Sequence, residues 1–267
     1  MASLRLLTRG RVMARVVILG AGISGHTAAL HLRRLLGRGH EVVVVSPNAD
    51  WNWIPSNIWV GVGRMSPGDV TFPLAPVYRR QGIGFRQARA VAIRPEGDGG
   101  SSQPAVDIVS TLPGRESEPE RLGYDYLINA TGPKLNFAAT PGLGPDGNSL
   151  SVCTPGHAQQ AARALDGVIE KLRAGQRQTL VIGVGHGMCT CEGAAFEYTF
   201  NVEHELRTRG LRDLADVIYL SNEYELGDFG VGGMVFRQQG FLSSSQIRPL
   251  TGTARTSLPA CSRPAAS

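Results

Sequence analysis

The chain has 267 residues, of which 42% are hydrophobic and 18% are charged, a composition that excludes a disordered chain and a fibre. Four cysteines in this length exclude a disulfide-stapled scaffold, and their spacing lacks the C-x-x-C pairs of a zinc ribbon, so we expect no metal site. The formal net charge of +5 comes from the two ends: residues 1–15 carry +4 and residues 242–267 carry +3, which leaves −2 between them. Nucleic-acid binding needs basic residues gathered on a folded face, so this distribution argues against a nucleic-acid partner.

Both ends of the chain are predicted to be disordered. Residues 1–13 form an Arg-rich leader without acids and without the apolar core of a secretory signal, which is typical of a transit peptide or of sequence upstream of the true start, Met1 or Met13. Residues 242–267 are rich in Ser, Pro, Thr, Ala and Arg and lack periodicity, a composition that a shifted reading frame would also produce. No apolar run is long enough for a transmembrane helix. We expect a cytoplasmic or peripheral membrane protein.

The body of the chain alternates short apolar runs with stretches of helical periodicity, the pattern of an α/β fold. We predict two Rossmann-like dinucleotide-binding units with parallel sheets, at 14–150 and 151–241, the second incomplete and the first carrying a β-meander insertion. In chain order, the predicted elements are strands at 15–19 and 41–45 around a helix at 26–36, a loop at 51–63, a helix at 73–81, antiparallel strands at 85–93 and 105–111, a strand at 124–130, a helix at 157–172, a strand at 179–182, a helix at 194–209 and a strand at 217–220.

The first glycine loop, G-A-G-I-S-G, predicts a dinucleotide site. Gly20 permits the tight turn out of the strand, Gly22 lets the backbone approach a pyrophosphate, and Gly25 lets helix and strand pack closely. The helix N-terminus then presents free N–H groups to the phosphates. The acid that usually binds the ribose at the end of the second strand is missing, and Ser46 and Asn48 stand there as uncharged hydrogen-bonding candidates.

A second short motif closes the predicted strand at 124–130. The triplet Ala130, Thr131 and Gly132 has the form of a second flavin motif, in which the backbone approaches the cofactor near the first glycine loop. Its position behind a GxGxxG loop and a β-meander favours FAD over a plain NAD-dependent dehydrogenase. We therefore predict that these three residues line the FAD site.

The second glycine loop is irregular, because Met188 stands where a third glycine would allow helix and strand to pack closely. Cys191, at the start of the following helix, is a redox candidate or a small buried residue, and His186 is the histidine of this loop to test. Glu223, at the end of the next strand, keeps NADH binding open. Cys153 lies in a short extended segment before a helix, a setting that suits an accessible redox thiol as well as a core residue.

Five stretches, in this order, resemble the sulfide:quinone oxidoreductases, relatives of flavocytochrome c sulfide dehydrogenase and of type-II NADH dehydrogenases. The resemblance runs from residue 14 to residue 240, and the stretches A-T-G-P-K-L and C-E-G-A-A-F-E-Y are its more specific parts. The five stretches are Gly20–Gly25, Pro73–Pro76, Tyr124–Leu135, Ser151–Cys153 and Cys191–Tyr198.

This resemblance implies a flavoprotein with FAD in the first unit, in which a pair of redox cysteines takes up sulfide and passes electrons through FAD to a membrane quinone. Cys153 matches the first cysteine of the pair. The family's second cysteine, its final Gly-Asp flavin motif and its membrane-attaching helices lie beyond the point where this chain leaves the pattern, and Cys261 is no replacement. We therefore expect weak FAD retention and no sulfide-dependent quinone reduction from the chain as given.

Two other functions stay open at the level of sequence. One is an NADH:quinone oxidoreductase that uses the second glycine loop for NADH, and the other is an inactive nucleotide-binding fragment. In the main interpretation sulfide and quinone are the small-molecule partners, and peripheral membrane contact is implied for full-length members of the family. The oligomeric state is not predicted.

Overall fold

The fold is described by a computed structural model that covers residues 13–98, 100–115, 119–184, 192–221 and 242–250. The chain forms two compact units. Unit 1 contains the residues up to Trp53 together with Thr71–Leu135, and unit 2 contains Ile54–Val70 together with the residues from Asn136 onward. This division differs from the predicted boundary at residue 150 in two ways: unit 2 begins at Asn136, and it also takes in the segment 54–70.

Unit 1 is built on a six-stranded sheet in the order β7-β6-β5-β2-β1-β8. Strand β2 is parallel to β1 and β5, β8 is parallel to β1, and β5, β6 and β7 form an antiparallel meander. The fold class predicted from the sequence is therefore confirmed for this unit. The strands of the sheet are β1 (Arg15–Leu19), β2 (Glu41–Ser46), β5 (Gly84–Arg94), β6 (Ala105–Ser110), β7 (Glu120–Gly123) and β8 (Tyr126–Asn129), and a separate hairpin pairs β3 (Asp50–Asn52) with β4 (Thr71–Pro73).

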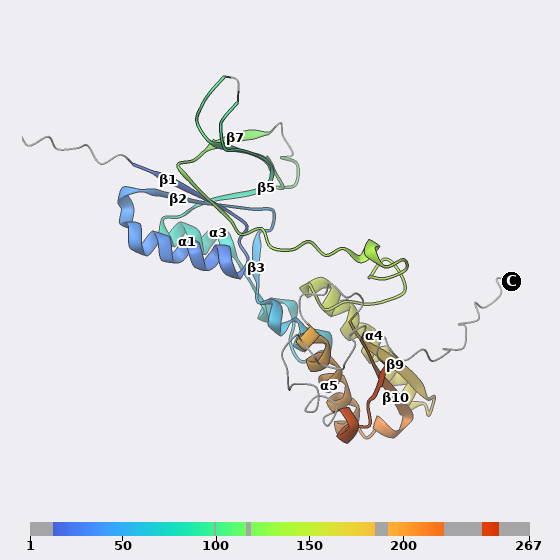
Figure 1. Ribbon diagram of the computed structural model, residues 1–267. Coiled ribbons are helices and arrows are strands. Elements are labelled where there is room, and N and C mark those ends of the chain that lie inside the picture. The colour runs from blue at the N-terminus through green and yellow to red at the C-terminus, as the bar shows by residue number, and fades with distance from the viewer. Residues whose placement is uncertain (1–12, 99, 116–118, 185–191, 222–241, 251–267) are drawn as a thin grey trace, which may run out of the picture. The chain divides into compact units, whose positions relative to one another are not determined.

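Both faces of this sheet are covered, which explains why β1 and β2 are continuous apolar runs rather than alternating ones. Helices α1 (Ile23–Leu36) and α3 (Leu74–Gln81) cover one face of the parallel strands β1 and β2, and the meander, which continues the same sheet, curls over their other face (Figure 1). The side chains of β1 alternate between the two cores, because Ile18 packs with the helices and Val17 with the meander. The helix-side core contains Val16, Ile18, Ala29, Val42, Val44, Leu74, Tyr78 and Ile83, and the meander-side core contains Val17, Leu19, Val43, Val45, Val106, Ile108 and Leu122.

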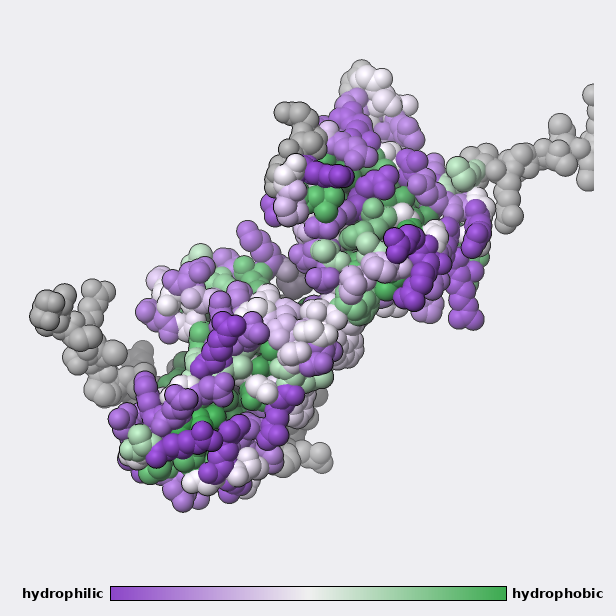
Figure 2. Space-filling model, turned by 180° about the vertical axis from the view of Figure 1, so that it is seen from behind, coloured by the Kyte–Doolittle hydropathy of each residue, from purple (hydrophilic) through white to green (hydrophobic). Residues whose placement is uncertain are grey.

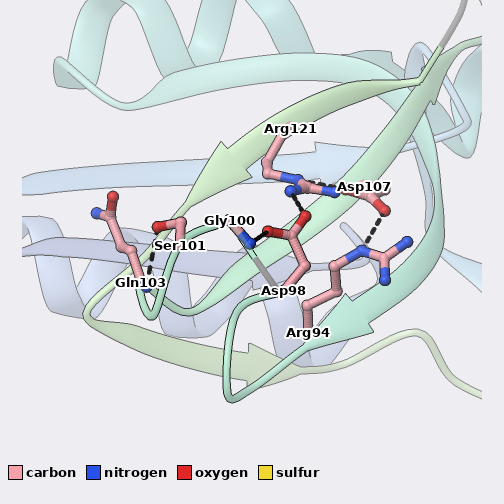
Figure 3. Close-up of polar contacts among 7 residues, drawn as sticks. All are labelled: Arg94, Asp98, Gly100, Ser101, Gln103, Asp107 and Arg121. Carbon is pink, nitrogen blue, oxygen red and sulfur yellow. Dashed lines mark hydrogen bonds and ion pairs between the residues drawn. The ribbon is translucent and has the colours of Figure 1, made fainter.

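A charged network ties the three strands of the meander together (Figure 3). The carboxylate of Asp107 in β6, which is only 10% exposed, accepts hydrogen bonds from Arg94 Nε in β5 at 2.7 Å and from Arg121 Nε in β7 at 3.0 Å. Arg121 also pairs with Asp98 in the β5–β6 turn. Because two guanidinium groups share one carboxylate, the buried charge of Asp107 is fully compensated.

Unit 2 contains a smaller sheet of three parallel strands in the order β11-β10-β9. Its core is made by the sheet and two long helices, and Phe196 stacks on Tyr219 with ring centroids 4.1 Å apart. One face of β9 stays open among the described residues, because burial alternates along the strand and Val181 is 58% exposed. The elements are α4 (Pro155–Arg173), β9 (Gln178–Gly183), α5 (Glu192–Thr208), β10 (Ala215–Leu220) and β11 (Arg248–Leu250).

The segment predicted as a loop at 51–63 contains regular structure. Its first residues belong to β3, and helix α2 (Asn57–Gly61) follows and contacts α4 and α5 of unit 2. The short 3₁₀ helices of the chain are Gly37–Gly39, Ile54–Ser56, Pro67–Asp69, Phe137–Ala139 and Arg212–Leu214. In each unit the face turned to the viewer in Figure 2 is mostly polar with interspersed apolar patches, and no described helix is long and apolar enough to cross a bilayer.

The structure differs from the predicted disorder of 242–267 over residues 242–250. Strand β11 pairs with β10, and Leu242 and Ile247 are buried in the core of unit 2. The guanidinium of Arg212, itself buried, donates hydrogen bonds to the carbonyl oxygens of Ser245 and Gln246 at 3.1 and 2.8 Å. These long-range contacts, rather than any local periodicity, order the segment, while residues 251–267 and the leader 1–12 lie outside the described residues.

Candidate functional site

The first glycine loop connects β1 to α1 in a tightly packed turn. Gly20 has a φ of 95°, which disfavours any residue with a Cβ, and its N–H donates to the carbonyl of Val45 at 2.8 Å. A Cβ on Gly20 would overlap the carbonyl oxygen of Ala130, and a Cβ on Gly25 would overlap the carbonyl oxygen of Gly20. These two glycines are therefore required by the packing of loop, helix and strand.

Gly22 is different, because a Cβ placed there would have no described atom within 4 Å. It is the N-cap residue of α1, and no described side chain caps this helix. The start of α1 therefore has no side-chain cap among the described residues, and the space beside Gly22 is open. Binding of a dinucleotide pyrophosphate at this loop, with Gly22 as the position that a side chain would obstruct, stays a prediction.

The A-T-G triplet lies directly beside this loop. The N–H of Ala130 donates to the carbonyl of Leu19 at 2.8 Å, so the end of β8 is paired with the end of β1. The hydroxyl of Thr131 donates to Asn129 Oδ1 at 2.9 Å, and Gly132 has a φ of 68°. The structure thus brings together the two motifs that the sequence separates by a long stretch of chain, and their common role in binding FAD stays a prediction.

The predicted ribose contacts lie at the end of β2, on the same edge of the sheet. Ser46 is buried, and its Oγ accepts a hydrogen bond from the N–H of Asn48 at 3.3 Å. Asn48 is exposed. Of the two candidates, Asn48 therefore has the side chain that is free to approach a ligand, whereas Ser46 holds the turn.

An aromatic cluster packs beside the first turn of α1. The ring of His26 lies against Trp51, Phe72 and Tyr78, and its Nδ1 is 3.1 Å from the Tyr78 hydroxyl. Burial lowers the pKa of His26 and raises the pKa of Tyr78 to about 12. These two side chains are thus neutral packing partners near neutral pH.

Cys153 is a free, exposed cysteine immediately before helix α4. Its N–H donates to Ser151 Oγ at 3.1 Å. The next residue, Thr154, is the N-cap of α4 and accepts a hydrogen bond from the N–H of His157 at 3.2 Å. The thiol is therefore accessible and sits on an ordered backbone, the setting that a reactive cysteine needs.

The second cysteine candidate lies outside the described residues. Cys191, like His186 and Met188, belongs to the segment 185–191 of the second glycine loop, so the structure describes no relation between Cys153 and Cys191. Gly183 is described at the end of β9, where a Cβ would overlap the carbonyl oxygen of Leu220 in β10. This first glycine of the second loop is explained by strand packing alone.

Sequence reasoning missed the surroundings of Cys153. The Tyr198 hydroxyl donates to the carbonyl of Gly61 at 3.1 Å, and Val152 packs against the same part of α2. Nearby, Arg64 pairs with Glu205, whose side chain is only 3% exposed. The one signal available in the sequence was Tyr198, the last residue of the C-E-G-A-A-F-E-Y stretch, but its partners are far away along the chain.

Residues 14–209 match the family model described as pyridine nucleotide-disulphide oxidoreductase. The chain belongs to this family. Among curated relatives, a sulfide-quinone reductase from Aquifex aeolicus is 32% identical over 219 residues, which cover 82% of this chain and 45% of the relative. An external alternative NAD(P)H-ubiquinone oxidoreductase from Arabidopsis thaliana is 28% identical over 131 residues, or 48% of this chain and 21% of that relative.

Solved structures give the same picture. The sulfide:quinone oxidoreductase of Aquifex aeolicus superimposes with a TM-score of 0.73 and 26% identity, covering 90% of this chain and 51% of that one. A Plasmodium falciparum NDH2 in complex with NADH shares the fold, with a TM-score of 0.64, 15% identity and coverage of 89% and 48%. The resemblance to sulfide:quinone oxidoreductases is confirmed, and the chain spans about half the length of these relatives.

Proposed function

We propose that this protein is a flavin-dependent oxidoreductase of the sulfide:quinone type, with FAD bound at the first glycine loop and sulfide oxidised at Cys153. The observation that carries the proposal is the joint placement of the open Gly22 position, the uncapped start of α1 and the A-T-G triplet at one edge of the unit 1 sheet. The similarity to sulfide-quinone reductase supports the choice of substrates.

The residues of this chain divide the proposed work between them. The first-turn N–H groups of α1 bind the pyrophosphate, Gly22 leaves room for it, and Asn48 donates or accepts a hydrogen bond at the ribose. Bound FAD supplies the two-electron acceptor that the sulfur chemistry requires. The Cys153 thiolate forms a sulfur–sulfur bond with hydrosulfide, which gives a cysteine persulfide and releases one proton and two electrons.

A quinone is the proposed acceptor of the electrons from the flavin. Quinones are apolar molecules of the membrane, so the full protein would work at a membrane surface, as the resemblance implies. A second candidate function, the oxidation of NADH, is favoured by the similarity to NAD(P)H-ubiquinone oxidoreductases. It requires a nucleotide to bind at the second glycine loop, where the sequence has Met188 in place of a third glycine.

The cofactor part is tested by flavin content after reconstitution with FAD. Gly22→Val places a branched side chain where the pyrophosphate must approach, so we expect the protein to fold and to lose bound flavin. Gly167→Val, in the middle of α4, is the matched control, because a Cβ there also has no described atom within 4 Å. Equal flavin content in Gly22→Val and the parent would remove this loop from the cofactor site.

The chemical part is tested by stopped-flow bleaching of the bound flavin, first with sulfide and then with NADH. In a chain restored to the full length of the family, we expect sulfide to reduce the bound flavin and Cys153→Ser to abolish this reaction while flavin binding survives, because a hydroxyl cannot form a persulfide. Reduction by NADH alone would favour the second candidate function. If sulfide still reduces the flavin in Cys153→Ser, the Cys153 thiol takes no part in the reaction.

A further inference from the structure

We propose that Gly61 and Tyr198 are positioning residues for Cys153: they form a junction between α2 and α5 that holds Val152, and through it the backbone that carries the thiol. All of these residues belong to unit 2. The junction gives a role to the last residue of the C-E-G-A-A-F-E-Y stretch, which the proposed function does not use.

The junction depends on the absence of a side chain at residue 61. A Cβ on Gly61 would lie 2.8 Å from Tyr198 Cε2 and 2.8 Å from Val152 Cγ1, closer than real Cβ contacts come. The Tyr198 ring and the Val152 side chain therefore both rest on the bare backbone of α2. The Tyr198 hydroxyl adds a hydrogen bond to the Gly61 carbonyl at 3.1 Å, which fixes the ring in this place.

The donor in this hydrogen bond is stable over the working pH range. Burial raises the pKa of Tyr198 to about 12, so the hydroxyl keeps its proton near neutrality. The segment 54–70 is anchored at a further point on α5, since Arg64 pairs with the buried carboxylate of Glu205. The α2 segment is thus tied to α5 by a hydrogen bond and by an ion pair.

Cys153 is held from both sides by these contacts. On its N-terminal side, Val152 also packs against the apolar cluster of Val60, Val70 and Ala158. On its C-terminal side, Thr154 caps α4, and its carbonyl accepts the N–H of Ala158 at 2.9 Å. Fixed neighbours on both sides set the backbone position of Cys153 and the direction of its Cα–Cβ bond, which is part of the preorganisation that a reacting group requires.

The test measures the alkylation rate of Cys153 by iodoacetamide under native conditions, with peptide mass spectrometry to separate the cysteines and Cys261 as the reference. Tyr198→Phe removes the hydrogen bond, and we expect the rate of Cys153 labelling to change by roughly two- to tenfold, the population change that one net hydrogen bond corresponds to. Tyr126→Phe is the matched control, because Tyr126 is 65% exposed and belongs to unit 1. Gly61→Ala should have a larger effect.

A double-mutant cycle separates positioning from general stability. If Val152 transmits the effect, Tyr198→Phe combined with Val152→Ala should change the labelling rate by no more than the single variant with the larger change. A lower melting temperature of Tyr198→Phe with an unchanged rate of Cys153 labelling would overturn the proposal. A double variant whose change in labelling rate is the product of the two single changes would overturn it as well. The role in turnover rests on the proposed function, but labelling needs neither flavin nor sulfide. Failure of sulfide oxidation and failure of positioning are therefore distinguishable.

Discussion

The two strand–glycine–helix junctions share one feature and differ in another. Gly20 ends β1 and Gly183 ends β9, and a Cβ on either would overlap the carbonyl oxygen of a neighbouring strand end, Ala130 in the first case and Leu220 in the second. Both strand ends are also paired by backbone hydrogen bonds near the glycine, from Ala130 to Leu19 and from Val184 to Leu220. The first glycine of such a motif is therefore explained by close packing within the sheet, and its presence alone is not evidence of a bound nucleotide.

The difference lies in the third glycine. In unit 1, Gly25 brings α1 against the carbonyl of Gly20, an approach that a Cβ would prevent. The corresponding residue of the second loop is Met188, which lies outside the described residues. A residue with a Cβ does not fit the arrangement that Gly25 makes in the first loop. The comparison favours a dinucleotide at the first junction and weakens the candidate role of the second junction in NADH binding.

The largest effects are expected at the feature that the two junctions share. Gly20→Val and Gly183→Val should each lower the free energy of unfolding by roughly 3 kcal/mol or more, because the side chain would collide with a backbone that cannot move away. Gly20→Val should be the more severe, since its positive φ adds strain. Urea unfolding with hydrogen exchange of peptides from each unit measures this, and a loss no greater than that of the Gly167→Val control would contradict it.

Much of the fold could be predicted because its signals are local. The apolar runs of β1, β2 and β9 are short and continuous, Gly20 follows β1 directly and Gly183 ends β9, and the structure places these strands where the sequence indicated. Helix α2 was missed because it has only five residues, and burial of Ile58 and Val60 depends on α4 and α5 rather than on its own periodicity.

The candidate site divides in the same way. The motif around Gly22 and the triplet at Thr131 could be predicted, since each has a short recognisable pattern, and the pairing of β8 with β1 brings them together. The contact of Tyr198 with Gly61 joins residues 137 positions apart. The sequence around Gly61 and the sequence around Tyr198 contain no pattern that predicts this contact, so only the three-dimensional structure could show it.

A smaller effect is expected at the edge of the unit 2 sheet, where the sequence predicted disorder. Arg212→Lys keeps the charge but loses the planar group that donates to Ala215, Ser245 and Gln246, so we expect a loss of about 1.5–3 kcal/mol. Residues 242–250 should become sensitive to limited proteolysis. Arg177→Lys, at an exposed backbone contact, is the control, and equal protease resistance of both variants would mean that Arg212 does not hold this edge.

The smallest expected effect is a loss of folding stability at low pH, and it involves one carboxylate in each unit. Asp107 lies between Arg94 and Arg121, and Glu205 between Arg64 and Arg209. Hydrogen bonds from Arg94 and then Arg121 lower the pKa of Asp107. Burial alone would raise the pKa of Glu205, but hydrogen bonds from its two arginines outweigh burial, so this pKa is lowered as well.

A carboxyl group whose pKa is lower in the folded state stabilises the fold above its ordinary pKa, and this stabilisation is lost as the pH falls through the lowered value. Both units should therefore lose stability below about pH 4, where such groups begin to bind protons. Asp107→Asn should reduce the acid dependence of unit 1 by about one proton and leave unit 2 unchanged, while Glu205→Gln should do the reverse. Hydrogen exchange of peptides from each unit, followed from pH 6 downward, measures the two slopes separately. Because the arginines are partly exposed, added salt should weaken the acid dependence of stability in both units. An acid dependence of unit 1 that survives Asp107→Asn would assign it to other carboxylates and leave the meander network without a measurable electrostatic role.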